Sequence, residues 1–152
     1  MKKSTRIFIK FAAFLLSLVL VLPLQAQAAL PETVEPQANQ YISNTSCQLQ
    51  AKGNGKLNIG FSIQTYSVMK KLGVQTIVLY ESTDNVEYFP VRVYYSSDYS
   101  GMMGSNTYWH SYSLTYSGVA RRYYRASFVF TVQTNSGVKS TITEWSMDVR
   151  AT

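Results

Sequence analysis

The chain has 152 residues, of which 14 are basic and 8 acidic, giving a formal net charge of +6, and 14% of its residues are aromatic. This length favours one folded domain, and a single cysteine excludes an intramolecular disulfide. Four of the basic residues lie in the first ten positions, so residues 29–152 carry ten basic and eight acidic side chains, a net charge of +2. The high charge is therefore a poor argument for nucleic-acid or membrane-surface binding.

The first 28 residues have the pattern of a secretory signal peptide. A positive segment ends at Lys10, an apolar stretch runs over 11–24, and Ala26-Gln27-Ala28 provides a small-residue cleavage site. The uncharged stretch is about 14 residues long, shorter than the roughly 20 needed to cross a bilayer. We therefore expect a secreted, extracellular protein that starts near Ala29 and has no stable membrane insertion after cleavage.

An extended N-terminal arm is expected over 29–40, and β-strands follow it. A strand over 43–51, a tight turn over 52–55 and a strand over 57–65 predict a hairpin, because apolar and polar residues alternate in the second strand. We expect a basic loop over 67–72, and then a central strand over 74–81 that is apolar on both faces.

The second half of the chain continues in the same manner. Pro90 predicts an edge or a bulge in a strand over 86–95, because proline donates no hydrogen bond to a sheet. The longest loop is expected over 96–106. Three further strands are expected, over 107–116, 122–134 and 139–149. Seven short strands at this spacing predict an all-β domain over 41–152, a single antiparallel β-sandwich.

One motif resembles a known domain type. Tyr124-Arg125-Ala126-Ser127-Phe128, followed by the turn Asn135-Ser136-Gly137, is similar to the sixth strand of immunoglobulin or fibronectin type III domains. In those domains a tyrosine near the start of the strand closes a corner. Leu72-Gly73-Val74-Gln75-Thr76-Ile77 and Tyr123-Tyr124-Arg125 also resemble small secreted Gram-positive bacterial proteins of unknown function. The resemblance covers about 41–149; it implies the fold and the exported setting, and no active site.

The sequence offers little material for catalysis. His110 is the only histidine, and nothing in the sequence supports its pairing with Cys47. Cys47 is expected to be a small buried residue; a reactive thiol or an intermolecular bridge are the alternatives. Asp84, Asn85 and Glu87 lack calcium-loop spacing and read as turn formers. We therefore expect no catalytic, cofactor-binding or metal-binding residue.

Aromatic residues give better material for binding. Tyr80, Tyr88, Tyr94, Tyr123 and Arg125 are candidates for the solvent face of one sheet, and rings of this kind are enriched in recognition surfaces. The alternative is that tyrosine-rich strands only stabilise a sheet, and Tyr80 could also face inward.

Two further regions are candidates for binding. The loop over 98–106, with Met102, Met103 and nearby Trp109, could form an adaptable contact tip. The basic run over 121–125 could meet an anionic polymer, although a solvated strand entrance is the simpler interpretation.

These observations lead to one functional hypothesis. We expect a monomeric, exported, non-catalytic binding module for a surface glycan, a wall polymer or a protein, with no nucleic-acid partner. A secreted effector of bacteriocin or toxin type is the alternative. An enzyme ranks third, because it would need His110 beside another titratable group in a cleft.

Overall fold

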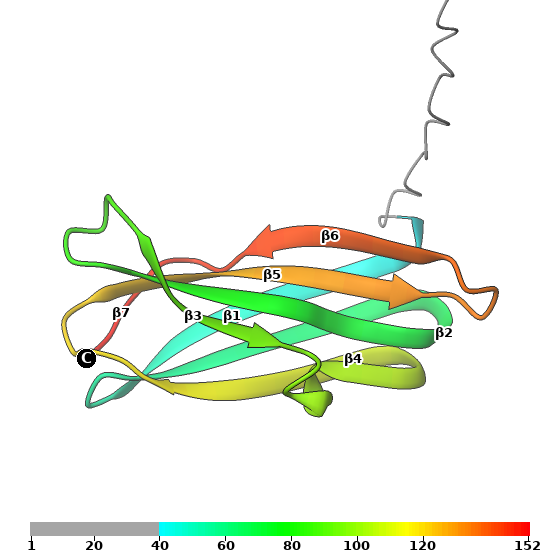
Figure 1. Cartoon of the computed structure of the whole chain (residues 1–152), viewed down its shortest axis with the longest axis horizontal. Coiled ribbons are helices and arrows are strands. Elements are labelled where there is room, and N and C mark those ends of the chain that lie inside the picture. The colour runs from blue at the N-terminus through cyan, green and yellow to red at the C-terminus, as the bar shows by residue number, and fades with distance from the viewer. Residues whose placement is uncertain (1–39) are drawn as a thin grey trace, which may run out of the picture. The chain divides into compact units, whose positions relative to one another are not determined.

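The computed structural model describes residues 40–152, which form seven antiparallel strands and one short 3-10 turn (Figure 1). No α-helix occurs in this range. The expected signal peptide, 1–28, and nearly all of the expected arm, 29–40, lie outside the described residues. The elements are β1 (Ile42–Gly53), β2 (Lys56–Ser82), β3 (Phe89–Tyr95), η2 (Ser100–Met102), β4 (Met103–Ser117), β5 (Tyr123–Gln133), β6 (Lys139–Trp145) and β7 (Val149–Arg150).

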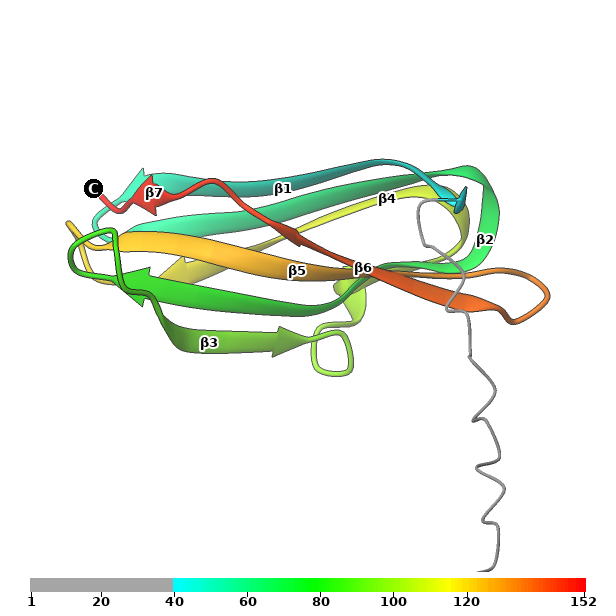
Figure 2. The same cartoon turned by 90° about the horizontal axis from the view of Figure 1, so that it is seen from above.

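The strands form one continuous sheet organised around β2, which is 27 residues long. Its first half pairs with β1 and β4, and its second half pairs with β5, β3 and the start of β4. Strand β5 also pairs with β6 and β7. Figure 2 shows that β2 bends at one end and returns, so the sheet curls into a half-barrel. The all-β antiparallel prediction is confirmed, but the hydrogen-bonded strands make one curled sheet and not two separate sheets.

The two halves of the curled sheet enclose the core. Strand β2 places Leu57, Ile59, Phe61 and Ile63 inward, and β5 places Tyr124, Ala126, Phe128, Phe130 and Val132 inward, all nearly inaccessible to solvent. Phe61 meets Phe130 edge-on, with 6.0 Å between ring centroids. Thr45 of β1 donates a hydrogen bond of 2.9 Å to Glu144 of β6. The predicted period-two alternation of β2 and β5 is therefore confirmed. Burial of each large apolar side chain stabilises the fold by about 2 kcal/mol.

Tyr124 ties the β4–β5 connection to the core. The Val119 backbone N–H donates to the Tyr124 hydroxyl at 2.8 Å, and this hydroxyl donates to Glu81 Oε2 at 2.5 Å. Burial, together with the hydrogen bond to Glu81, raises the pKa of Tyr124 to about 12. The same carboxylate lies 4.0 Å from Arg122 Nε. The Tyr124 hydroxyl thus joins the β4–β5 connection to β2 through these two hydrogen bonds.

The prediction of a loop over 67–72 is wrong, because β2 runs through this stretch. Met69 pairs with Thr107, and Lys71 pairs with Ser105. A register shift between Gln64 and Met69 produces the bend, and it leaves Tyr66 and Val68 exposed on the outside. A Met and a Leu at inward positions, 69 and 72, keep the segment in the sheet.

Three other boundaries differ from the predictions. Strand β3 begins at Phe89 and not at 86, because the turn before it extends to Glu87; the bulge expected from Pro90 is present beside Tyr80. Strand β4 begins at Met103, inside the expected loop. The last strand is interrupted after Trp145, because Ser146 bonds Ala126 with its side-chain oxygen as well as its backbone N–H.

Candidate functional site

The curled sheet brings four side chains together on the outer face of its second half. Tyr80 of β2 and Arg125 of β5 are directly opposite partners. Trp145 of β6 pairs with Ser127, two residues along β5, and therefore shares their face. Tyr88 reaches the same place from the β2–β3 connection. We call Tyr80, Tyr88, Arg125 and Trp145 the aromatic–arginine cluster.

Arg125 is the centre of this cluster. Its Cζ lies 4.1 Å from the ring centroid of Tyr88, 5.2 Å from that of Trp145 and 6.0 Å from that of Tyr80. The Tyr80 and Trp145 rings are themselves 5.5 Å apart. Arg125 Nε is buried and has no hydrogen-bond partner within 40–152. The guanidinium is therefore held by ring faces, each contact contributing about 0.5–1 kcal/mol at an exposed site.

A rigid turn holds Tyr88 in place. Asp84 Oδ1 accepts hydrogen bonds from the backbone N–H groups of Val86 and Glu87, and Ser82 donates to it. These bonds lower the pKa of the exposed Asp84 carboxyl. Tyr88 donates to Asn85 Oδ1 at 2.5 Å. Desolvation, and then the nearby Asp148 carboxylate, raise the pKa of Tyr88 to about 12. The prediction that Asp84 and Asn85 form a turn is thus confirmed.

The other candidate residues lie apart from the cluster or beside it. Tyr123 lies next to Arg125 on the same face of β5 and packs against Arg150, whose Cζ is 5.6 Å from the ring centroid. Trp109 is 52% exposed on β4, in the first half of the sheet. The expected solvent-face position of Tyr94 is wrong, because it points into the core and is 4% exposed. It pairs with Ile77, which also faces inward.

The expected contact tip at 98–106 is also largely wrong. Met102 is fully buried in the core, because η2 turns its side chain inward. Met103 begins β4 and is partly buried. The backbones of β2 and η2 approach each other closely here, and Gly73 of β2, at φ +153°, permits this approach. A Cβ on residue 73 would lie 2.1 Å from the Met102 carbonyl oxygen.

Trp145 was missed as a site residue by the sequence reasoning. The signal was available, since the turn at 135–137 sets the register of β5 against β6. Counting outward from the pair Gln133–Lys139 places Trp145 opposite Ser127 and so on the same face as Arg125. Trp145 is 52% exposed, whereas Tyr80 and Tyr88 are partly buried. Trp145 is therefore the most accessible ring of the cluster.

Neither candidate for nucleophilic chemistry has a suitable environment. Desolvation, and then the charge of Glu144, raise the pKa of the Cys47 thiol to about 12, so the thiolate is suppressed near neutral pH. His110 Nε2 donates to the Gly101 carbonyl at 2.8 Å, and its ring packs against Phe61. Within residues 40–152, no three His, Cys, Asp or Glu side chains gather as metal ligands.

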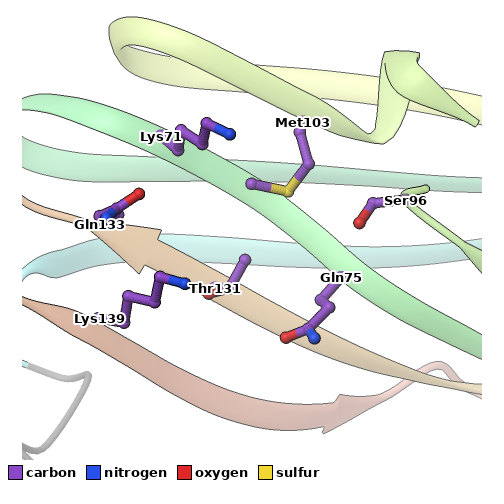
Figure 3. A pocket seen from close by; sticks show the side chains of 7 residues that line it. All are labelled: Lys71, Gln75, Ser96, Met103, Thr131, Gln133 and Lys139. Carbon is purple, nitrogen blue, oxygen red and sulfur yellow. The ribbon is translucent and has the colours of Figure 1, made fainter. Parts of the chain in front are cut away.

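The surface of residues 40–152 includes two hollows near these elements. The first, of about 220 Å³, is shown in Figure 3. The pairing of β2 with β5 places it at the other end of the outer face from the cluster. We call it the lysine pocket; it is lined by Lys71, Gln75, Ser96, Met103, Thr131, Gln133 and Lys139. The second, of about 530 Å³, lies on the first half of the sheet around Gly60 and is lined mainly by uncharged polar residues.

Comparison with known proteins gives no functional assignment. No family model matches the chain, and no curated protein matches it in sequence. One similar solved structure is the sporulation control protein Spo0M from Bacillus subtilis, with 9% identity and a TM-score of 0.38. The match covers 67% of this chain and 46% of Spo0M, so the chain spans less than half of that protein. Among the described residues, no helix has the length and apolar character to span a membrane.

Proposed function

We propose that this protein is an exported, non-catalytic binding module that contacts a polymer of the cell surface or cell wall through the aromatic–arginine cluster. The observation that carries the proposal is the convergence of Tyr80, Tyr88 and Trp145 around Arg125 on an outer face. Exposed rings stack on the flat faces of sugars, and arginine and tryptophan are enriched where binding energy concentrates. The signal-peptide pattern of residues 1–28 supports export.

We further propose that the two facing halves of the curled sheet form a β-sandwich of the immunoglobulin/fibronectin III type, with β2 passing from one half to the other. The hydrogen bond from Val119 to Tyr124 supports this assignment, because such a corner recurs in these domains. In such sandwiches the inner faces are filled by the core, which leaves the outer faces and loops for recognition.

Export is tested by secretion of the full chain from a bacterial host. We expect the protein in the culture medium with a mass that corresponds to cleavage between Ala28 and Ala29. Recovery only from the cells, with the full mass, would contradict the export proposal.

Binding is tested by pelleting the secreted protein with isolated Gram-positive cell walls at low and high salt. The two tryptophans give a matched pair, since Trp109 and Trp145 are each 52% exposed but lie in different halves of the sheet. We expect Trp145→Ala to weaken retention about tenfold, as for a central aromatic contact, and Trp109→Ala to leave it unchanged. Retention that survives high salt supports ring stacking. Equal effects of the two substitutions would refute the proposal that the cluster is the binding site. Failure of the unsubstituted protein to pellet with the cell walls would refute it as well.

A further inference from the structure

We propose that the lysine pocket is a binding site for a phosphate group. It lies on the outer face shared by β2, β5 and β6, at the end away from the aromatic–arginine cluster, and it is independent of that cluster. Figure 3 shows the side chains of Lys71 and Lys139 on either side of Gln133, with Gln75 and Ser96 farther along the hollow.

The two lysines belong to one row across three strands. Lys71 of β2 pairs with Gln133 of β5, and Gln133 pairs with Lys139 of β6. Adjacent strands are about 4.8 Å apart, so the Cα atoms of the two lysines are separated by roughly 10 Å. A side-chain amide thus stands between two ammonium groups, an arrangement that offers donors to an anion from three directions.

No carboxylate of the described chain compensates these charges. The residues that line the pocket include no acid, and the side chains of Lys71 and Lys139 form no ion pair or hydrogen bond within residues 40–152. The acid nearest along the chain to Ser96 is Asp98, which accepts a hydrogen bond from Ser97 and does not line the pocket. Two uncompensated like charges repel each other, and a bound anion would offset that repulsion.

A local irregularity of β2 shapes the hollow. The register against β5 shifts between Val74 and Thr76, so Gln75 is an extra residue and its side chain is exposed at the pocket. Bulges of this kind re-aim a side chain and often lie beside functional sites. The Gln75 carbonyl also accepts the Ser96 N–H at 2.9 Å, which fixes the Ser96 wall of the hollow.

The chemistry of the lining selects the ligand. Two ammonium groups, two amides and two hydroxyls are donors suited to a compact, multiply charged oxyanion, and 220 Å³ accommodates a phosphate or one phosphodiester unit. The phosphate could be free or part of a polymer such as a glycerol-phosphate chain, and the experiment distinguishes these two sources.

The test is a two-dimensional NMR titration of the secreted protein with inorganic phosphate, and separately with a glycerol-phosphate polymer at equal phosphate concentration. We expect the side-chain amide signals of Gln75 and Gln133 to shift in both titrations. Lys71→Gln and Lys139→Gln should each weaken binding about threefold, and the double variant about tenfold. Tighter binding of the polymer, per phosphate, identifies a polymer as the source, and equal binding identifies free phosphate.

Lys70→Gln is the matched control, because Lys70 is adjacent, exposed and outside the pocket. It removes the same charge from the protein and should change the affinity less than twofold, since long-range effects of exposed charges are screened. Equal weakening by Lys70→Gln and Lys71→Gln would overturn the proposal, as would phosphate-induced shifts confined to the arginines at 121–125. Because the NMR shifts report on the lysine pocket alone, this test is independent of the retention of Trp145→Ala on cell walls.

Discussion

Replacement of Tyr124 by Phe tests the hydrogen bonds that join the β4–β5 connection to the core. The ring is fully buried, so the substitution keeps the apolar packing and removes only the hydroxyl. Two hydrogen bonds are lost: the one from the Val119 N–H at 2.8 Å and the one to Glu81 Oε2 at 2.5 Å. The Glu81 carboxylate then keeps a single weak contact, with Arg122 Nε at 4.0 Å.

The expected cost follows from these two bonds. A neutral hydrogen bond contributes about 1 kcal/mol and one to a charged group about 1.5–3 kcal/mol, so Tyr124→Phe should lower the free energy of unfolding by about 2–4 kcal/mol. Urea denaturation followed by fluorescence measures this difference. Tyr116→Phe is the control, because its ring packs against Tyr124 and its hydroxyl makes no hydrogen bond within residues 40–152. A difference below about 0.5 kcal/mol between the two variants would refute the reasoning.

Three further predictions concern the core and three titratable groups whose pKa values are raised. Gly73→Ala should destabilise the protein by at least about 2 kcal/mol in urea, because its Cβ would meet the Met102 carbonyl oxygen at 2.1 Å; near-normal stability would contradict the close approach. Cys47 should resist a thiol reagent at mildly alkaline pH and react once the protein is unfolded, because its pKa is raised to about 12. Tyr88 and Tyr124 should titrate late in an absorbance titration, and the stability they contribute should be complete below pH 10 and lost as the pH rises toward about 12, because their pKa values are raised from 10.0 by burial; ordinary titration of all tyrosines would contradict this.

The hairpins of this fold could be predicted from the sequence because their signals are local. Alternation over 57–65 and the turn at 52–55 define β1 and β2, and the backbone confirms the turn with positive φ at Gly53, Asn54 and Gly55. The turn at 135–137 likewise joins β5 and β6. In each case the pleat and the turn residues specify the same pairing, so no distant contact is needed to decide it.

The bend of β2 could not be predicted, because it depends on contacts far along the chain. Residues 67–72 contain two lysines and no strand alternation of their own, and β4 supplies the partner that keeps them in the sheet. The same long-range pairing buries Met102, which is the last residue of η2, immediately before β4, and is not part of a free loop. For the site, the alternation of β5 predicts the outward face of Arg125, whereas the sequence left the face of Tyr80 open. The inward position of Tyr94 depends on the bulge beside Pro90.

The two proposed sites share one outer face for a reason that lies in the pleat. Inward positions of β2 and β5 are filled by the core, so the alternate positions of the same strands carry Tyr80 and Arg125 at one end and Lys71 and Gln133 at the other. Eight residues of β5 separate Arg125 from Gln133, which corresponds to roughly 26 Å along an extended strand. A ligand that reached both sites would therefore have to be a polymer, since neither a single sugar nor a free phosphate spans that length. Substitutions at these outer positions leave the core residues in place, so the binding tests on Trp145 and Lys71 measure recognition and not unfolding.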